Sequence, residues 1–210
     1  MLQTVFADLR VWGAAAAFAV ILPGLSFLLN RRLLGGRLDT DIRQIVLLAA
    51  LTFLTAILCE AGINMLYEAV FREKLWEYRL LPLHDRNVSA LALLVWTAYG
   101  MHLYFMLQFL DHRIPAGPRQ GFYKACIIGA EAPLLWEVAG NIYFLSVVNE
   151  FYAYYLPDDL FHFTSLRVVP LYMLCIYFGL LVYGRLRDHA HDWRIAGVCF
   201  GGGVMFLAAG

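Results

Sequence analysis

Charged residues are scarce in this chain of 210 residues. They make up 15 % of the sequence, whereas hydrophobic residues make up 61 %. A soluble domain typically has about 25 % charged and about 45–50 % apolar residues. The shortage of charge therefore argues against an ordinary soluble domain and predicts an integral membrane protein in contact with the lipid bilayer. The formal net charge is zero, so no basic field favours binding to nucleic acid.

Motifs for common cofactors and nucleophiles are also missing. The chain contains no GxGxxG, P-loop, GxSxG or HExxH pattern. The cysteines stand singly, without a CxxC pair or metal-ligand spacing, and we interpret them as buried, unreactive thiols: Cys59, Cys126, Cys175 and Cys199. His102 is the one histidine well inside an apolar segment. Because it has no evident partner for a haem, we interpret it as a hydrogen-bonded structural residue, and we expect neither a metal nor a cofactor.

Six apolar segments have about the length that a transmembrane helix needs, which is roughly 20 residues. They cover residues 11–30, 42–67, 88–110, 122–147, 166–183 and 195–210. The sequence thus predicts an all-α integral membrane protein, with residues 1–210 forming a single transmembrane domain of six helices, or seven. Ten of the 16 Lys and Arg residues fall on one side of this arrangement. The positive-inside rule makes that side cytoplasmic and places the N- and C-termini on the non-cytoplasmic side.

Several carboxyl side chains lie inside these apolar segments, where a buried charge is costly. Glu60, Asn64 and Glu68 are four residues apart, so they share one face of the second helix. An apolar environment favours a protonated carboxyl, which can act as a general acid. Hydrogen bonding between helices is the structural alternative. We take Glu60, Glu68 and Glu137 as the catalytic candidates, with Glu131 as a further candidate nearer the inner side.

The second and third segments resemble the fourth and fifth, which indicates an internal helix-hairpin repeat. One register aligns Glu60 and Asn64 with Glu137 and Asn141, and a second register aligns Glu68 with Glu137. In each hairpin an aromatic connection reaches Leu-Pro and then aspartate. Because the unit is a hairpin, both copies keep the same orientation, and their axis runs along the membrane normal. The repeat places two carboxyl-bearing helices in the same half of the bilayer.

Aromatic residues make up 15 % of the chain and gather around the two connections. A ring face stabilises a nearby cation by about 0.5–2 kcal/mol, so an aromatic cavity beside a protonated carboxyl suits carbocation chemistry. An interfacial belt of Trp and Tyr is the alternative for any one of these rings. The side chains that we expect to contact a substrate are Asn64, Tyr67, Trp76, Tyr78, Trp96, Trp136, Asn141 and Tyr154.

The segment from Asn64 to Phe71 resembles the N-x-x-W-E-x-x-Y motif of the small integral-membrane terpene cyclases (meroterpenoid cyclases). Asn64 and Glu68 match the family's Asn and Glu, while Tyr67 and Phe71 stand where Trp and Tyr are usual. The second copy keeps the Trp-Glu pair at Trp136. A late aspartate that serves these cyclases as a second acid has no counterpart within a span. The carboxyl helix followed by a W-x-Y connection is also similar to membrane lycopene cyclases and carotenoid hydratases. The region from Tyr67 to Tyr104 more loosely resembles bacteriochlorophyllide vinyl hydratases.

The resemblance implies an enzyme without a cofactor that protonates an alkene or epoxide of a lipophilic isoprenoid. A terpene cyclase is the first expectation, with Glu68 or Glu60 as the proton donor and Glu137 as the second carboxyl. An alkene hydratase or isomerase acting on a carotenoid, a sterol or a vinyl porphyrin is one alternative. A non-catalytic accessory subunit or assembly factor of a membrane complex is another, and it predicts no dry cavity. A homo-oligomer is left open.

Overall fold

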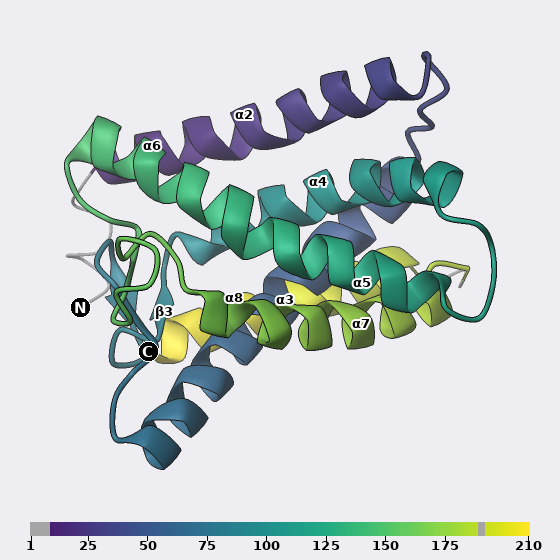
Figure 1. Cartoon of the computed structure of the whole chain (residues 1–210). Coiled ribbons are helices and arrows are strands. Elements are labelled where there is room, and N and C mark those ends of the chain that lie inside the picture. The colour runs from purple at the N-terminus through teal and green to yellow at the C-terminus, as the bar shows by residue number, and fades with distance from the viewer. Residues whose placement is uncertain (1–8, 189–191) are drawn as a thin grey trace.

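The computed structural model describes residues 9–188 and 192–210 (Figure 1). Helices dominate these ranges and follow one another with short connections. Their bounds are α2 Leu9–Leu33, α3 Ile42–Phe71, α4 Ala92–Arg113, α5 Gln120–Glu131, α6 Val138–Val148, α7 Val169–Leu186 and α8 Asp192–Ala209. Each of the six expected segments is found as a helix, with its ends shifted by a few residues. The largest shifts are four residues: residues 88–91 precede α4 instead of belonging to it, and α3 runs on to Phe71 beyond the predicted end at residue 67.

The fourth segment is one helical rod made of three parts. A π-helical stretch, Ala132–Glu137, joins α5 to α6 without a break. Pro133 lies in this stretch and has no backbone N–H to donate, which loosens the regular i to i−4 ladder. A widened turn also changes which residues face the bundle on either side of it. Glu131 and Glu137 flank this turn and make separate sets of contacts, as described below.

Four helices in the described part of the chain are long and apolar enough to cross a membrane. They span Leu9–Leu33, Ile42–Phe71, Ala92–Arg113 and Leu166–Leu186, the last of which includes the 3-10 turn Leu166–Val168. A shorter apolar helix covers Trp193–Ala208. These dimensions are those of a membrane protein. They bear out the helical membrane class in its coarse form, with four qualifying helices where the sequence predicted six.

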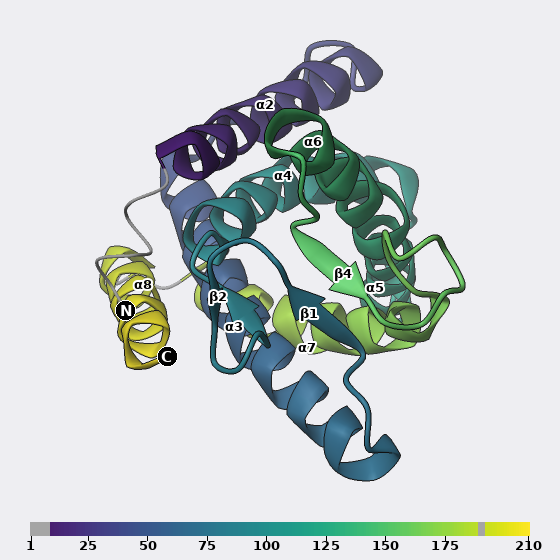
Figure 2. The ribbon, with the colours of Figure 1, turned by 90° about the vertical axis from the view of Figure 1, so that its left-hand side faces the viewer.

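Four short strands lie at one end of the helices, where the sequence analysis predicted only aromatic connections. Strand β1, Trp76–Tyr78, pairs antiparallel with β4, Ala153–Tyr155. Strand β2, Pro82–Leu83, pairs with β3, Val88–Ser89. Figure 2 looks onto this end and shows β1 and β4 lying across the space between α3, α4, α6 and α7. The fold is therefore helical with a small strand cap, which refines the all-α expectation.

The β1–β4 ladder relates the two hairpins by a local two-fold axis. Its central pair is Glu77 with Tyr154, flanked by Trp76 with Tyr155 and Tyr78 with Ala153. In the register that aligns Glu60 with Glu137, Glu77 and Tyr154 are equivalent positions, so the two copies meet at their own counterparts. Both copies also enter the cap from the same end of the bundle (Figure 1). The predicted repeat of equally oriented hairpins is thus visible in the ladder itself.

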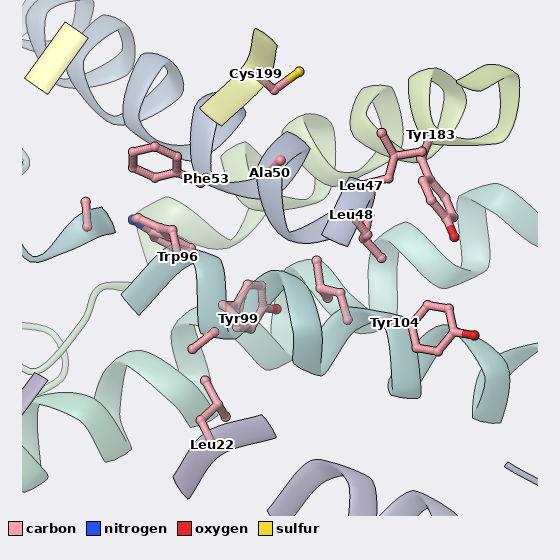
Figure 3. Packing of buried hydrophobic residues seen from close by; sticks show 14 of the residues in the cluster. Leu22, Leu47, Leu48, Ala50, Phe53, Trp96, Tyr99, Tyr104, Tyr183 and Cys199 are labelled. Carbon is pink, nitrogen blue, oxygen red and sulfur yellow. The ribbon is translucent and has the colours of Figure 1, made fainter. Parts of the chain in front are cut away.

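The buried face of α3 carries the site. Its buried side chains recur every three or four residues, at Leu47, Ala50, Phe53 and Ile57, which is the spacing of one helix face. Figure 3 shows Phe53 and Ala50 close to Trp96 of α4 and to Cys199 of α8. The same stripe continues into Glu60 and Asn64, which are also buried. Helix packing therefore carries two polar side chains into the centre of the bundle.

Close packing of α5 against α7 depends on Gly129. A methyl group added there would stand 2.5 Å from Cα of Met173 and 2.6 Å from its backbone nitrogen. We expect Gly129→Ala to lower the free energy of unfolding by about 1–3 kcal/mol, because two backbones must move apart. The measurement is the thermal midpoint of the detergent-solubilised protein. Gly179→Ala, on α7 with no atom within 4 Å of the added methyl, is the control, and an equal effect of both substitutions would contradict this account.

Candidate active site

Asn64 and Asn141 join the two carboxyl helices to the two strands. The Asn64 side-chain oxygen accepts from the backbone N–H of Leu75 at 2.8 Å, and its amide donates to the carbonyl of Trp76 at 2.9 Å. Asn141 accepts from the N–H of Tyr152 at 2.9 Å and donates to the carbonyl of Ala153 at 2.9 Å. In both copies these partners lie 11 and 12 residues after the asparagine. The same bonds at the same spacing favour the register that aligns Glu60 with Glu137.

The second donor bond of each asparagine differs between the copies. The Asn64 amide also donates to the side chain of Asn87 at 2.7 Å, whereas the Asn141 amide donates to the carbonyl of Phe163 at 2.7 Å. Both asparagines are almost fully buried, at 0 % and 1 % exposed. Each therefore satisfies several buried polar groups of the cap at once. The asparagines are positioning residues of the cap, which is a role different from the expected contact with substrate.

Glu60 lies one turn before Asn64 and is also buried. One carboxyl oxygen, Oε1, accepts from the Tyr78 hydroxyl and from the Trp96 indole N–H, the latter at 2.9 Å. The other oxygen, Oε2, is buried and has no hydrogen-bond partner among the described residues. A buried polar atom left without a partner is rare in folded proteins and calls for an explanation. Glu60 lines a cavity, so its free oxygen is placed where a bound molecule could contact it.

Glu137 is the counterpart of Glu60 and is more fully satisfied. Its Oε2 accepts from the hydroxyls of Tyr155 at 2.6 Å and Thr164 at 2.7 Å, and its Oε1 accepts from Tyr172. Tyr155 follows Glu137 by 18 residues, as Tyr78 follows Glu60. Both oxygens of Glu137 are thus occupied, whereas Glu60 keeps one oxygen free. The two carboxyls differ in the way that separates an acid from a supporting group.

The strand tyrosines are reliable donors to these carboxyls. Burial raises the pKa of Tyr78 and of Tyr155 well above the ordinary phenol value. Both hydroxyls therefore stay protonated across the physiological range. Strand alternation turns Tyr78 and Tyr155 toward the helices, together with Trp76. The cap is thus a source of hydrogen-bond donors for the bundle beneath it.

A cavity of about 330 Å³ lies between α3, α4 and α7. Its lining is mostly aliphatic, and its polar end is formed by Glu60, Trp76, Trp96, Tyr99 and Tyr172. Leu174 and Phe178 of α7 also line it, and they are 55 % and 56 % exposed. The cavity therefore reaches the apolar outer surface of the bundle. Its volume lies at the lower end of the range, about 300–1,000 Å³, that is typical of ligand sites.

The pseudo-equivalent cleft of the other hairpin is nearly full. A cavity of only about 40 Å³ remains there, lined by Glu137, Asn141 and Trp136 together with Phe18 and Leu22 of α2. Figure 2 shows α2 lying over α4 and α6, on the side of the bundle away from α7. Helix α2 thus inserts apolar side chains where the first cleft is empty. One of two related clefts is left to accept an apolar molecule.

Two predicted site residues lie away from this cavity. Glu68 is exposed, two turns beyond Glu60, where α3 projects away from the other helices (Figure 1). Tyr67 is partly buried on the same projecting part, where its ring packs against Phe71 at 4.5 Å and its hydroxyl accepts from Arg167 at 2.8 Å. The structure therefore separates the residues matched to the cyclase motif from the cavity, because α3 runs on beyond the buried stripe.

Two further predicted residues have other partners. Tyr154 is the central residue of β4, and it faces away from the helices, stacked on His162 at 4.4 Å with Arg79 above its ring at 5.0 Å. Trp136 lines the small second cavity, and its indole N–H donates to Glu131. Of the predicted set, Glu60, Trp76 and Trp96 line the large cavity, and Tyr78 reaches it through Glu60.

Sequence reasoning missed Tyr172, Tyr155 and Thr164 as partners of Glu137. Tyr155 was available from the repeat, because its distance from Glu137 equals that of Tyr78 from Glu60. Tyr172 carried no such signal, since its counterpart donor in the first copy is the indole of Trp96. In the described part of the chain, no three His, Cys, Asp or Glu side chains gather as ligands for a metal ion.

Comparison with known proteins adds no relative. No protein-family model, curated protein or solved structure matches this chain. The site is therefore interpreted from its own geometry.

The two asparagines offer a direct test of the cap. We expect Asn141→Ala to lower the free energy of unfolding by about 1–3 kcal/mol, because buried backbone groups of β4 lose their partner. Thermal unfolding in detergent, with limited proteolysis of the β4 connection, measures the loss. Ser146→Ala, on the exposed face of α6, is the control and should change neither. A cap that resists protease equally in both variants would argue against this role for Asn141.

Proposed function

We propose that this protein is a membrane-embedded enzyme that protonates a C=C bond or an epoxide in a lipophilic isoprenoid. Glu60 is the proton donor, and a terpenoid cyclisation or isomerisation follows from the cation. The observation that carries the proposal is the unpartnered Oε2 of Glu60 on the wall of a large apolar cavity. All six rods cross the membrane in this proposal, with both termini on the non-cytoplasmic side.

The hydrogen bonds around Glu60 favour Oε2 as the oxygen that holds the proton. Oε1 accepts from two donors, Tyr78 and Trp96, and so serves as the carbonyl oxygen of a neutral acid. The proton then belongs on Oε2, which no described residue engages. After proton transfer the same two donors stabilise the new carboxylate. Donors held in place in a dry site are effective in this way, because no solvent has to reorganise.

The aromatic end of the cavity suits the cation that protonation creates. Trp76, Trp96 and Tyr172 line the same end as Glu60, and ring faces stabilise a desolvated cation by about 2 kcal/mol. The exposed leucine and phenylalanine of α7 provide a route from the surrounding lipid. An apolar molecule can therefore enter sideways and present one alkene to the buried acid. Glu137 supports this end through Tyr172, to which it is hydrogen-bonded.

The resemblance to membrane terpene cyclases supports the same reaction but matches a different glutamate of α3 as the acid. The motif match selects Glu68, whereas burial, donors and cavity select Glu60. Hydration of the cation by water is the alternative outcome on the same site. The accessory-subunit alternative predicts no dry cavity, and the cavity of about 330 Å³ weighs against it.

Substitution of the two glutamates of α3 tests the assignment. We expect Glu60→Gln to reduce turnover by about 10²–10⁴-fold, because an amide cannot supply the proton. Glu68→Gln makes the same change on the same helix outside the cavity, and we expect it to retain turnover. The measurement is mass spectrometry of lipid extracts from cells fed geranylgeraniol or a prenylated quinone. A product of the same mass as its precursor reports cyclisation or isomerisation. A product that is heavier by one water reports hydration.

Thermal midpoints of both variants control for folding. If Glu68→Gln abolishes turnover while Glu60→Gln retains it, the role of donor passes to Glu68. If folded wild-type and variant proteins give identical extracts, catalysis by these glutamates is ruled out.

Two native cysteines report occupancy of the cavity without any assay of turnover. Cys59 and Cys175 both line it, with their sulfur atoms 3.4 Å apart. We expect geranylgeraniol to slow their alkylation by N-ethylmaleimide several-fold, because a bound chain covers both thiols. Cys126 is partly buried, as Cys59 and Cys175 are, but it lies outside the cavity lining. Its alkylation rate should therefore not change. Alkylation rates of Cys59 and Cys175 that stay the same when geranylgeraniol is added would contradict binding in this cavity.

A further inference from the structure

A second buried acid–base cluster lies beside the cavity and has no part in the chemistry described so far. Its centre is Glu131, at the end of α5. Glu131 Oε1 lies 3.0 Å from Nε2 of His102, and Glu131 Oε2 accepts from the Tyr99 hydroxyl at 3.0 Å. The Trp136 indole N–H also donates to Oε1. The cluster thus joins α4 to the junction of α5 with the π-helical turn.

Helix α2 extends the cluster on its far side. The other ring nitrogen of His102, Nδ1, lies 2.8 Å from the hydroxyl oxygen of Ser26, and the Asn30 amide donates to that hydroxyl at 3.2 Å. Ser26, Asn30 and His102 are between 3 % and 6 % exposed. The result is a continuous chain from Tyr99 through Glu131 and His102 to Ser26. Each of these four side chains can both release and accept a proton.

A merely structural role would not require ionisable groups here. Neutral amides and hydroxyls fasten apolar helices together at a lower desolvation cost than a carboxyl and an imidazole. Ionisable side chains inside spanning helices are therefore candidates for function by default. The arrangement of a hydroxyl, an acid–base group and an orienting partner is also the general form of a proton-relay site.

Tyr99 is the member of this chain that reaches the large cavity. Tyr99 lines the cavity together with Glu60, which comes from the neighbouring helix. Trp96 lies between them, in edge-to-face contact with Tyr99 at 5.5 Å and hydrogen-bonded to Glu60. Figure 3 shows Trp96 and Tyr99 following each other along α4. A carboxylic acid and a relay-backed phenol therefore border the same apolar space.

We propose that Tyr99 is the proton acceptor of the reaction, with Glu131 and His102 as positioning residues that take up its proton. This inference rests on the proposed function of Glu60 as donor. First, Glu60 adds its proton to the C=C bond, leaving a carbocation and the Glu60 carboxylate. A C–H bond beside the cationic carbon then breaks, and its electron pair forms a new C=C bond. Its proton goes to the Tyr99 oxygen while the Tyr99 hydroxyl proton passes to Glu131.

The balance of atoms assigns the reaction class. One proton enters the substrate and one leaves it, so the product has the mass of the precursor, as in an isomerisation or an eliminative cyclisation. Glu131 returns its proton to solvent, and Glu60 regains one, after the product has left. Hydration would instead leave the added proton in place and consume a water molecule. Loss of the proton acceptor should therefore make the carbocation capture water, which gives an alcohol in place of an alkene, or should prevent product formation.

The test uses purified full-length protein in lipid nanodiscs with geranylgeraniol in deuterated buffer. The wild type should give a product that has the precursor's hydrogen count and carries one carbon-bound deuterium. Tyr99→Phe keeps the ring but removes the acceptor, and Glu131→Gln removes the relay; each should reduce that product by about 10²-fold or more. A structural role would not change the ratio of alkene to alcohol products, so this ratio is measured in every variant. Tyr104→Phe removes a buried hydroxyl on the same helix outside the cavity lining and should leave the ratio unchanged.

The outcomes separate the two proposals. If the wild type is active and Glu60→Gln is inactive, but Tyr99→Phe and Glu131→Gln match the wild type in rate and ratio, Tyr99 is not the acceptor and the donor stands. An alcohol as the sole wild-type product overturns the acceptor in the same way. If the wild type forms no product while the cysteine-protection experiment also shows no binding, both proposals fall.

Discussion

Two carboxyl groups inside an apolar bundle must find hydrogen-bond donors, and this requirement links the helices to the strand cap. One donor to each carboxyl comes from outside the helices, from two three-residue strands that cross the end of the bundle. Tyr78 and Tyr155 each face inward from a strand and each donate to the glutamate that precedes them by 18 residues. The strands in turn are held by Asn64 and Asn141, one turn after the same glutamates.

This arrangement makes the cap and the site one unit. A strand of three residues has too few ladder bonds to be stable alone. Pairing β1 with β4 and fastening each to an asparagine gives both strands enough partners. Because the central ladder pair joins equivalent positions, the two hairpins come together with their carboxyls under one cap. The stability of the cap and the placement of the donors therefore cannot be changed independently.

The two halves differ in the surroundings of their glutamates. Glu137 has donors on both oxygens, and its cleft is filled by Phe18 and Leu22 of α2. Glu60 keeps one oxygen free and faces an empty apolar cavity. The two hairpins supply two similar carboxyl sites, and α2 fills the cleft beside one of them. The third carboxyl, Glu131, lies outside the repeat and is joined to α2 and α4 through His102.

The amino-acid sequence was enough to predict the helical membrane class, the positions of the helices to within a few residues, and the repeat. These follow from composition and from local periodicity, which any apolar segment of the right length displays. It also pointed to Glu60, Trp76 and Trp96, because polar and aromatic groups in such segments are conspicuous. The strands were not predicted, because two or three residues carry no periodic signal and the partner of β1 lies far away in the chain. Tertiary packing distinguishes Glu60, which is buried beside the cavity, from Glu68, which is exposed: both share one helix face, but α3 leaves the bundle between them. Tertiary packing also decided that His102 meets Glu131 and that α2 fills one cleft, because these contacts join segments whose distance in space no local pattern encodes.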